Sequence, residues 1–250
     1  MRRWPVLPSV FLLALAACGA AEVAPVPETQ PEAVRSTDFA VLPCADIALK
    51  RPCALIMAGG KRVLVGAPAG VTLGLSQADL AGLDAVLLLS LRGEDVEGLD
   101  EVRNASWLAG REGPLPVGGP SGTKQFIGAL NAAFEVSDAM IFVEDRPAGG
   151  FDAALLALLP GEQDKQVIVF DTGDLQIAKI ESADSRTGYA VDYARYRVLL
   201  QPCGSDDAGV WADTADLFLG CESGWQLDET VFVYRGDGNL QNSTEILPEE

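Results

Sequence analysis

Four polar residues that could do chemistry follow the apolar run Ala85–Leu89, namely Ser90, Arg92, Glu94 and Asp95. The two carboxylates could bind Ca²⁺ or Mg²⁺, because these ions need only oxygen ligands. Adjacent residues rarely direct both side chains at one ion, however, and Arg92 is a ready partner for an ion pair. The favoured interpretation is therefore a loop tied by an arginine–carboxylate pair.

A second candidate is the pair Ser121 and Lys124, which has the S-x-x-K spacing of serine β-lactamases. A lysine one helical turn from a serine could take its proton and create a nucleophile. So short a pattern also arises by chance, and Ser121 or Thr123 could simply cap a helix that begins here. We therefore prefer the helix cap to the nucleophile.

Histidine is absent from the chain, which has 250 residues, 36 acidic side chains and 18 basic ones. This absence excludes Ser-His-Asp and Cys-His catalysis and every imidazole metal ligand. The net charge of −18 argues against nucleic acid as a partner, because phosphate binding relies on clustered Lys and Arg. Any catalysis would depend on carboxylates, Lys, Ser, Tyr or Cys.

The first 17 residues are predicted to be a secretory signal peptide. Arg2 and Arg3 precede the apolar run Val10–Ala17, which is too short for a lasting transmembrane helix. The run ends in LAAC, and this ending resembles a bacterial lipobox, in which Cys18 becomes the lipidated first residue. An ordinary signal peptide cleaved near Ala20 is the alternative.

The lipobox implies a location and a partner. The protein would be lipid-anchored in the bacterial cell envelope, with the membrane as one partner and the domain facing the periplasm. Gly19 after the cysteine favours the outer membrane over the inner one. Residues 18–38 are rich in Ala, Pro and Glu without apolar periodicity, so they are predicted to be a flexible tether. The folded domain is expected over residues 39–250, with no further segment long enough to span a bilayer.

Four cysteines remain in the predicted domain: Cys44, Cys53, Cys203 and Cys221. An even number of cysteines in an exported chain favours disulfides, and three pairings are possible. We prefer Cys44 with Cys53 and Cys203 with Cys221. A four-thiolate zinc site is the alternative, but no C-x-x-C spacing supports it.

Hydrophobic patterning predicts strands alternating with helices. Ala54–Met57 and Arg62–Val65 flank Gly59-Gly60 as a hairpin, and Val96–Leu108 has helical periodicity. Ser76 can cap a short helix over Gln77–Leu80, and the helix that begins near Ser121 has a pattern that runs through Phe126, Leu130, Ala133 and Phe134. Further hairpins are expected between residues 166 and 200 and again near the C-terminus. This order of elements predicts a two-sheet α/β sandwich with helices outside.

Four segments in this order resemble a known family. They are AGGKRVLVGAPAGVT (58–72), AVLLLSLRGEDVEGLDEV (85–102), PLPVGGPSGTKQFIGAL (114–130) and GYAVDYARYRVLL (188–200). Together they are similar to the metallo-β-lactamase superfamily, in its ribonuclease Z and arylsulfatase-like branch. The resemblance implies an α/β fold, a four-layer αββα sandwich of metallo-β-lactamase type.

The departures from the family pattern fall on its metal ligands. Histidines and acidic residues of the family are replaced. Gly66 stands where the family has an aspartate, and the permanently charged Arg92 stands where one ligand should donate. The positions that have lost the family's residue are Gly66, Ser90, Arg92, Glu94, Asp95 and Cys203.

The resemblance therefore implies an inherited scaffold without its metal centre. We expect no metal, no cofactor and no catalytic residue, but a binding or scaffolding role with an unknown small molecule or envelope protein as partner. The alternative is a hydrolase of esters or phosphoesters that uses oxygen ligands or a serine nucleophile at the same loop.

Overall fold

The structure is a computed structural model that describes residues 38–44, 51–163, 167–181, 186–204, 215–220, 231–234 and 240–243. All of them lie in one compact unit of the chain, Pro31–Glu250. The predicted signal peptide, Cys18, Cys221 and all of the tether except Asp38 fall outside the described residues.

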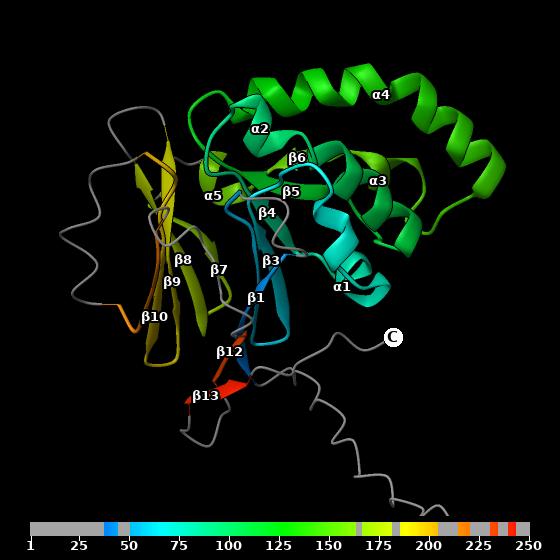
Figure 1. The fold of residues 1–250 in the computed structure, drawn as a ribbon. Helices are drawn as coiled ribbons and strands as arrows, with labels where there is room; N and C mark the ends of the chain where they lie inside the picture. The colour runs from blue at the N-terminus through cyan, green and yellow to red at the C-terminus, as the bar shows by residue number, and fades with distance from the viewer. Residues whose placement is uncertain are drawn as a thin grey trace, which may run out of the picture. The chain divides into compact units, whose positions relative to one another are not determined.

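The larger sheet has the strand order β13-β12-β1-β2-β3-β4-β5-β6 (Figure 1). Neighbours are antiparallel from β13 to β3 and parallel from β3 to β6. Its strands are β1 (Phe39–Pro43), β2 (Ala54–Ala58), β3 (Lys61–Val65), β4 (Ala85–Leu87), β5 (Leu115–Gly118), β6 (Leu156–Leu158), β12 (Val231–Tyr234) and β13 (Leu240–Ser243).

The predicted hairpin of β2 and β3 is confirmed. Ala58 pairs with Lys61, so Gly59 and Gly60 form a two-residue turn. Both glycines have positive φ, 57° and 73°, as the favoured two-residue hairpin turns require.

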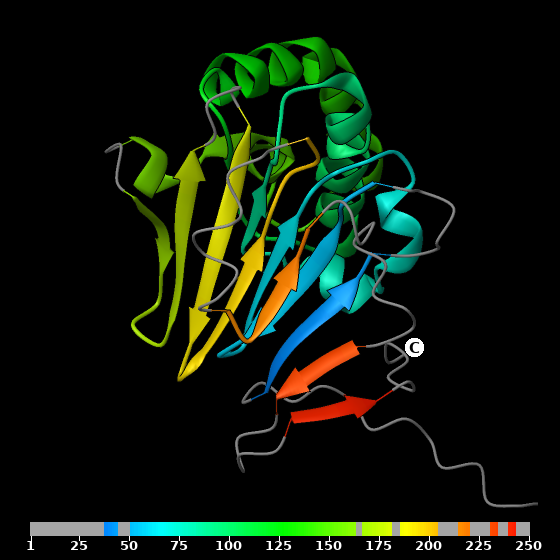
Figure 2. The ribbon, with the colours of Figure 1, turned by 60° about the vertical axis from the view of Figure 1, so that its left-hand side comes forward.

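The smaller sheet has the order β11-β10-β9-β8-β7. Its neighbours are antiparallel except for β10 and β11, which run parallel. Its strands are β7 (Ile168–Asp171), β8 (Leu175–Glu181), β9 (Thr187–Tyr193), β10 (Tyr196–Leu200) and β11 (Leu217–Leu219). Figure 2 shows the two sheets face to face, so the strands of one pack on those of the other.

The alternation of side chains along β4 explains why this strand is apolar at every position. Leu87 and Leu89 pack between the sheets, whereas Val86 and Leu88 pack beneath the helices. Successive side chains of a strand point to opposite faces, and both faces of β4 are covered. The continuous apolar run is therefore the signature of a central strand.

Helices α1 (Gln77–Ala81), α2 (Gly93–Val96), α3 (Leu99–Ala109) and α4 (Thr123–Asp145) lie on the side of the larger sheet away from the smaller one. The prediction of one helix from Val96 is wrong at its start. Gly98 separates α2 from α3: its N–H donates to the carbonyl oxygen of Ala67 at 2.9 Å, and a Cβ there would lie 2.1 Å from the carbonyl oxygen of Pro68. α1 matches its prediction, with Ser76 in a capping box. The remaining short elements are η2 (Val71–Gly74), η3 (Phe151–Ala154) and α5 (Pro160–Gln163).

α4 differs most from expectation. It continues eleven residues past Phe134, the last position of its predicted pattern, and Gly122 is its N-cap. By length and composition alone it could cross a membrane, contrary to the expectation for the domain, and 11% of its most apolar window is buried.

The two-sheet α/β sandwich is confirmed, with helices outside the larger sheet. In the part of the chain that the structure describes, no helix layer covers the outer face of the smaller sheet.

Candidate functional site

The predicted site lies at the edge of the sandwich where β4 ends. The backbone N–H of Thr187, which begins β9, donates to the carbonyl oxygen of Leu89 at 2.8 Å. Leu200, the last residue of β10, pairs with Tyr189 of β9. The chain segments leading to Ser90 and to Cys203 therefore reach the same edge, as the family resemblance requires.

Ser90 and Asp95 are bound to each other. The Ser90 hydroxyl donates to Oδ2 of Asp95 and accepts the backbone N–H of Arg92 at 3.1 Å. Ser90 is buried, with 3% of its surface exposed. Its hydroxyl thus closes the turn into α2 instead of pointing at a substrate or an ion.

The ion pair at this loop is made by Arg51 and not by Arg92. Nη2 of Arg51 lies 3.1 Å from Oε1 of Glu94, and its Nη1 lies 3.9 Å from Oδ1 of Asp95. The predicted arginine–carboxylate tie therefore exists, but with a different arginine. Arg92 is exposed.

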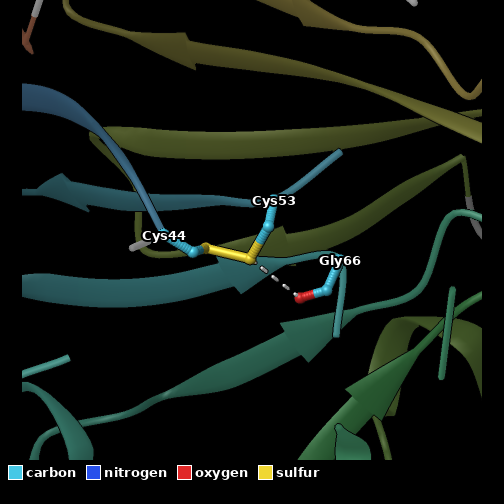
Figure 3. The surroundings of a disulfide bond; sticks show 3 residues. All are labelled: Cys44, Cys53 and Gly66. Atoms are coloured by element: carbon cyan, nitrogen blue, oxygen red, sulfur yellow. Dashed lines mark hydrogen bonds between the residues drawn. A yellow bond between two sulfur atoms is a disulfide. The ribbon is translucent and has the colours of Figure 1, made fainter. Parts of the chain in front are cut away.

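Arg51 was missed because it is distant in sequence. It lies in the segment between Cys44 and Cys53, and the predicted disulfide between these cysteines is confirmed (Figure 3). The disulfide closes the loop that presents Arg51 to α2. The sequence shows that this loop contains Lys50, Arg51 and Pro52. It does not show which carboxylate Arg51 would reach.

Gly66, which follows β3, has no room for a side chain. Its φ is 83°, and a Cβ would lie 2.2 Å from the carbonyl oxygen of Pro52. Its N–H donates to the carbonyl oxygen of Leu87 at 2.8 Å. The Sγ of Cys53 lies 3.6 Å from the carbonyl oxygen of Gly66, a close contact without a proton because this sulfur is in the disulfide. The backbone of the disulfide loop thus leaves no room for a side chain at the position where the resembled family has an aspartate.

Cys203 is disulfide-bonded, so it offers neither a carboxylate nor a free thiolate. The residue lies in the turn after β10, where Arg186 contacts the adjacent Gly204. Its predicted partner Cys221 lies outside the described residues, and the pairing of these two cysteines stays a prediction.

Polar contacts join the two sheets near the same edge. The Tyr189 hydroxyl donates to the carbonyl oxygen of Leu88 at 2.9 Å. Nζ of Lys179 lies 3.0 Å from Oε2 of Glu162 and donates to the carbonyl oxygen of Gly119 at 2.7 Å. Burial, and next the charge of Glu162, raise the pKa of Tyr189 well above its ordinary value. Nothing in the sequence distinguished these residues from ordinary strand positions.

Among the residues that the structure describes at this edge, one buried polar atom has no hydrogen-bond partner. The Thr187 side chain is buried, and its Oγ1 has no hydrogen bond. Thr187 shares a strand face with Tyr189, so it points toward the larger sheet.

The residues present do not fit the dinuclear metal centre of the resembled family. Such a centre needs imidazoles and a bridging carboxylate. Gly66 has no space for a ligand, Cys203 is oxidised, and the carboxylates of Glu94 and Asp95 are held by a guanidinium. Within the ranges that the structure describes, no group of three His, Cys, Asp or Glu side chains could hold a metal ion.

The S-x-x-K pair lacks the geometry of a nucleophile and its base. Ser121 precedes the N-cap of α4, so it lies outside the helix, and Lys124 is its second residue. Both are exposed, and the structure shows no hydrogen bond between these two described residues. The cap is Gly122 rather than Ser121 or Thr123, and the Thr123 hydroxyl instead donates to the carbonyl oxygen of Pro120 at 2.7 Å.

No family model and no curated protein matches the chain. Among solved structures, a long form RNase Z from yeast is similar with a TM-score of 0.50 and 10% identity, over 74% of this chain and 32% of that one. The protein has a metallo-β-lactamase fold. Human tRNase Z, short form, gives a TM-score of 0.49 with 16% identity over 73% of this chain and 76% of the other. The metallo-β-lactamase fold protein YhfI from Bacillus subtilis gives 0.47 with 15% identity, over 72% and 69%.

Proposed function

We propose that this protein is a cell-envelope lipoprotein whose metallo-β-lactamase-fold domain has lost its metal centre and serves in binding or scaffolding. In this proposal Cys18 carries the lipid, residues 18–38 form the tether, and the domain faces the periplasm from the outer membrane. Its partner would be a small molecule or an envelope protein.

The observation that carries the proposal is the arrangement at Gly66. A ligand side chain there would collide with the carbonyl oxygen of Pro52, and the Cys44–Cys53 disulfide holds that segment in place. Loss of the ligand is thus accompanied by a backbone that fills its space. Replacing Gly66 by aspartate would therefore not restore a metal ligand, because the surrounding backbone leaves no space for the side chain.

The hydrogen bonds around Ser90 support the same conclusion. Its hydroxyl and the carboxylate of Asp95 satisfy each other, and Arg51 neutralises Glu94. Buried or partly buried polar groups that are already paired gain little from a further ligand. The loop is therefore built for local stability.

Metal analysis of the purified full chain tests the loss of the metal centre. After exposure to zinc and removal of excess metal, we expect far less than one zinc per chain and no hydrolysis of ester or phosphoester substrates. Two tightly held zinc ions per chain would contradict the proposal.

Lipidation is tested separately by metabolic labelling with a fatty acid in a bacterial host. The unchanged chain should incorporate the label and fractionate with the outer membrane. Cys18→Ala should lose both properties. Its zinc content should be as low as that of the unchanged chain. Label retained by Cys18→Ala would refute lipidation at this residue.

A further inference from the structure

Strand β6 ends the larger sheet among the strands that the structure describes. The N–H of Leu115 in β5 donates to the carbonyl oxygen of Leu155 at 2.9 Å, and the N–H of Leu159 donates to that of Val117 at 2.9 Å. Successive residues of a strand direct their backbone groups to opposite sides, so Leu156 directs its N–H and C=O away from β5. These two groups belong to the open edge of the sheet.

The sequence of β6 does not itself protect this edge. Residues 155–159 read LLALL, without a charge or a proline. Their pairing with β5 is regular and contains no bulge. Natural sheets protect an edge by charged side chains, proline or a bulge, or by covering the edge. Protection of β6 therefore has to come from another element of the domain.

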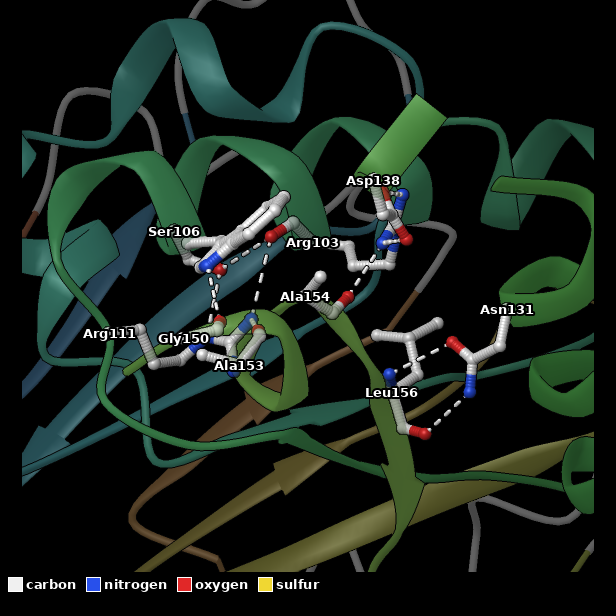
Figure 4. Close-up of polar contacts among 10 residues, drawn as sticks. Arg103, Ser106, Arg111, Asn131, Asp138, Gly150, Ala153, Ala154 and Leu156 are labelled. Atoms are coloured by element: carbon white, nitrogen blue, oxygen red, sulfur yellow. Dashed lines mark hydrogen bonds and ion pairs between the residues drawn. The ribbon is translucent and has the colours of Figure 1, made fainter. Parts of the chain in front are cut away.

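The side chain of Asn131 in α4 binds both open backbone groups of Leu156 (Figure 4). Its Nδ2 donates to the carbonyl oxygen of Leu156 at 2.9 Å, and its Oδ1 accepts the N–H of Leu156 at 3.0 Å. The amide of asparagine has both donors and an acceptor, as a peptide group does. The Asn131 amide thus makes the two hydrogen bonds that a residue of an added strand would make.

Helix α4 holds Asn131 at this edge. Ile127, one turn before Asn131, is 4% exposed, and Asp138, two turns after it, forms the buried ion pair with Arg103. These positions lie on the side of the helix that faces the domain. Asparagine is less favourable than alanine or leucine inside a helix. The two hydrogen bonds to Leu156 give a reason for asparagine at this position.

We propose that Asn131 is an edge guard, whose amide prevents β6 from pairing with β6 of a second copy of this chain. The proposal depends on α4 and β6 alone and not on the proposed function. Leu156 is 4% exposed, so loss of the amide would leave its N–H and C=O without a partner in a nearly dry place. An added strand satisfies both groups at once. The guard is an inhibitory contact that is built into the fold.

Asn131→Leu tests the guard, because leucine has a similar size and cannot form hydrogen bonds. Sedimentation velocity of the full chain in detergent measures association at low and at high micromolar concentration. We expect Asn131→Leu to associate increasingly as the concentration rises, relative to the unsubstituted chain at the same concentrations. Asn131→Ala, which removes the amide without adding an apolar side chain of this size, should behave in the same way and replaces Asn131→Leu if that variant does not fold.

Hydrogen exchange of the peptide that covers residues 155–159 locates the contact. In the unsubstituted chain the Leu156 amide should be protected at every concentration. In Asn131→Leu it should exchange about tenfold faster in dilute solution, because a hydrogen bond is lost. The protection should return as the concentration rises and β6 acquires a new partner. A purely stabilising role of Asn131 would not produce this return.

Asn131→Asp is the matched control. Aspartate can accept the N–H of Leu156 but cannot donate to its carbonyl oxygen. A charge at the edge also disfavours a further strand. Both Asn131→Asp and Asn131→Leu should lower the thermal midpoint by about 2–4 °C, but only Asn131→Leu should associate. The pair of variants thus separates loss of stability from loss of the guard.

Three outcomes would overturn the proposal. If Asn131→Leu and Asn131→Ala associate no more than the unsubstituted chain, Asn131 only stabilises the domain. Equal association of Asn131→Leu and Asn131→Asp would show that loss of stability alone causes it. Protection that returns only outside residues 155–159 would show that the copies meet through another surface.

Discussion

Arg103 of α3 and Asp138 of α4 form a bidentate ion pair inside the domain. Nη1 and Nη2 of Arg103 each lie 2.8 Å from a carboxylate oxygen of Asp138 (Figure 4). Nη1 also donates to the carbonyl oxygen of Ala154 at 2.6 Å. The side chains are 1% and 0% exposed, so α3, α4 and the segment before β6 depend on one desolvated contact.

Removal of one partner should be costly. Arg103→Leu leaves the Asp138 carboxylate buried without its cation, and the free energy of unfolding should fall by about 3–5 kcal/mol. Urea denaturation measures it. The control is Arg197→Leu, which breaks a half-exposed pair with Asp192 and should cost about 1 kcal/mol or less. Equal losses of stability in the two variants would contradict the conclusion that Arg103 and Asp138 contribute more as a buried pair than Arg197 and Asp192 do.

The buried pair should also show coupling. Because the double variant Arg103→Leu, Asp138→Leu leaves no unpaired charge, it should be more stable than Arg103→Leu alone. A double variant that is less stable by the sum of both single losses would show that the two residues act independently.

The buried Tyr189 should lower the free energy of unfolding of the domain in alkali. Its pKa is raised in the folded state, chiefly by burial, whereas the unfolded chain ionises near pH 10. The unfolded state therefore releases this proton first, and the free energy of unfolding falls as the pH rises above 10. Tyr189→Phe should reduce that slope by up to about 1.4 kcal/mol per pH unit. Denaturant titrations between pH 8 and 11 measure both slopes, and equal slopes would refute the prediction.

Gly66→Asp, which introduces the residue type of the resembled family, should damage the domain without creating a metal site. The positive φ and the contact with Pro52 predict a loss of more than about 2 kcal/mol. Thermal unfolding with and without zinc tests this. Gly113→Asp is the control, because a Cβ there meets nothing within 4 Å. Stabilisation of Gly66→Asp by zinc would contradict the prediction.

The Cys44–Cys53 disulfide closes a short loop, with a sequence separation of nine residues. Replacing both cysteines by alanine should lower the free energy of unfolding by about 2–3 kcal/mol through the greater freedom of the unfolded chain. Non-reducing peptide mapping should join Cys44 to Cys53 and Cys203 to Cys221. A peptide that links Cys44 to Cys203 would contradict both assignments.

Patterns that act locally were predicted well. The glycine turn after Ala58, the cap at Ser76 and the apolar run of β4 each depend on neighbouring residues. The start and end points of helices were predicted less accurately where a segment distant in sequence packs against the helix, as the Pro68 segment does at Gly98. The length of α4 was missed because its outward residues are apolar as well, so the one-sided periodicity disappears after Phe134.

The sequence by itself determined that histidine chemistry is absent, since residue types alone decide which atoms can donate. It also predicted the hairpin of β2 and β3, the buried strand β4 and the hairpins between residues 166 and 200, but neither β1 nor β6. Only the tertiary structure decided which groups lie together at the edge of the sandwich where β4 ends. Arg51 reaches Glu94 and the Pro52 carbonyl fills the space beside Gly66, because a disulfide and two sheets bring together segments that the chain keeps apart.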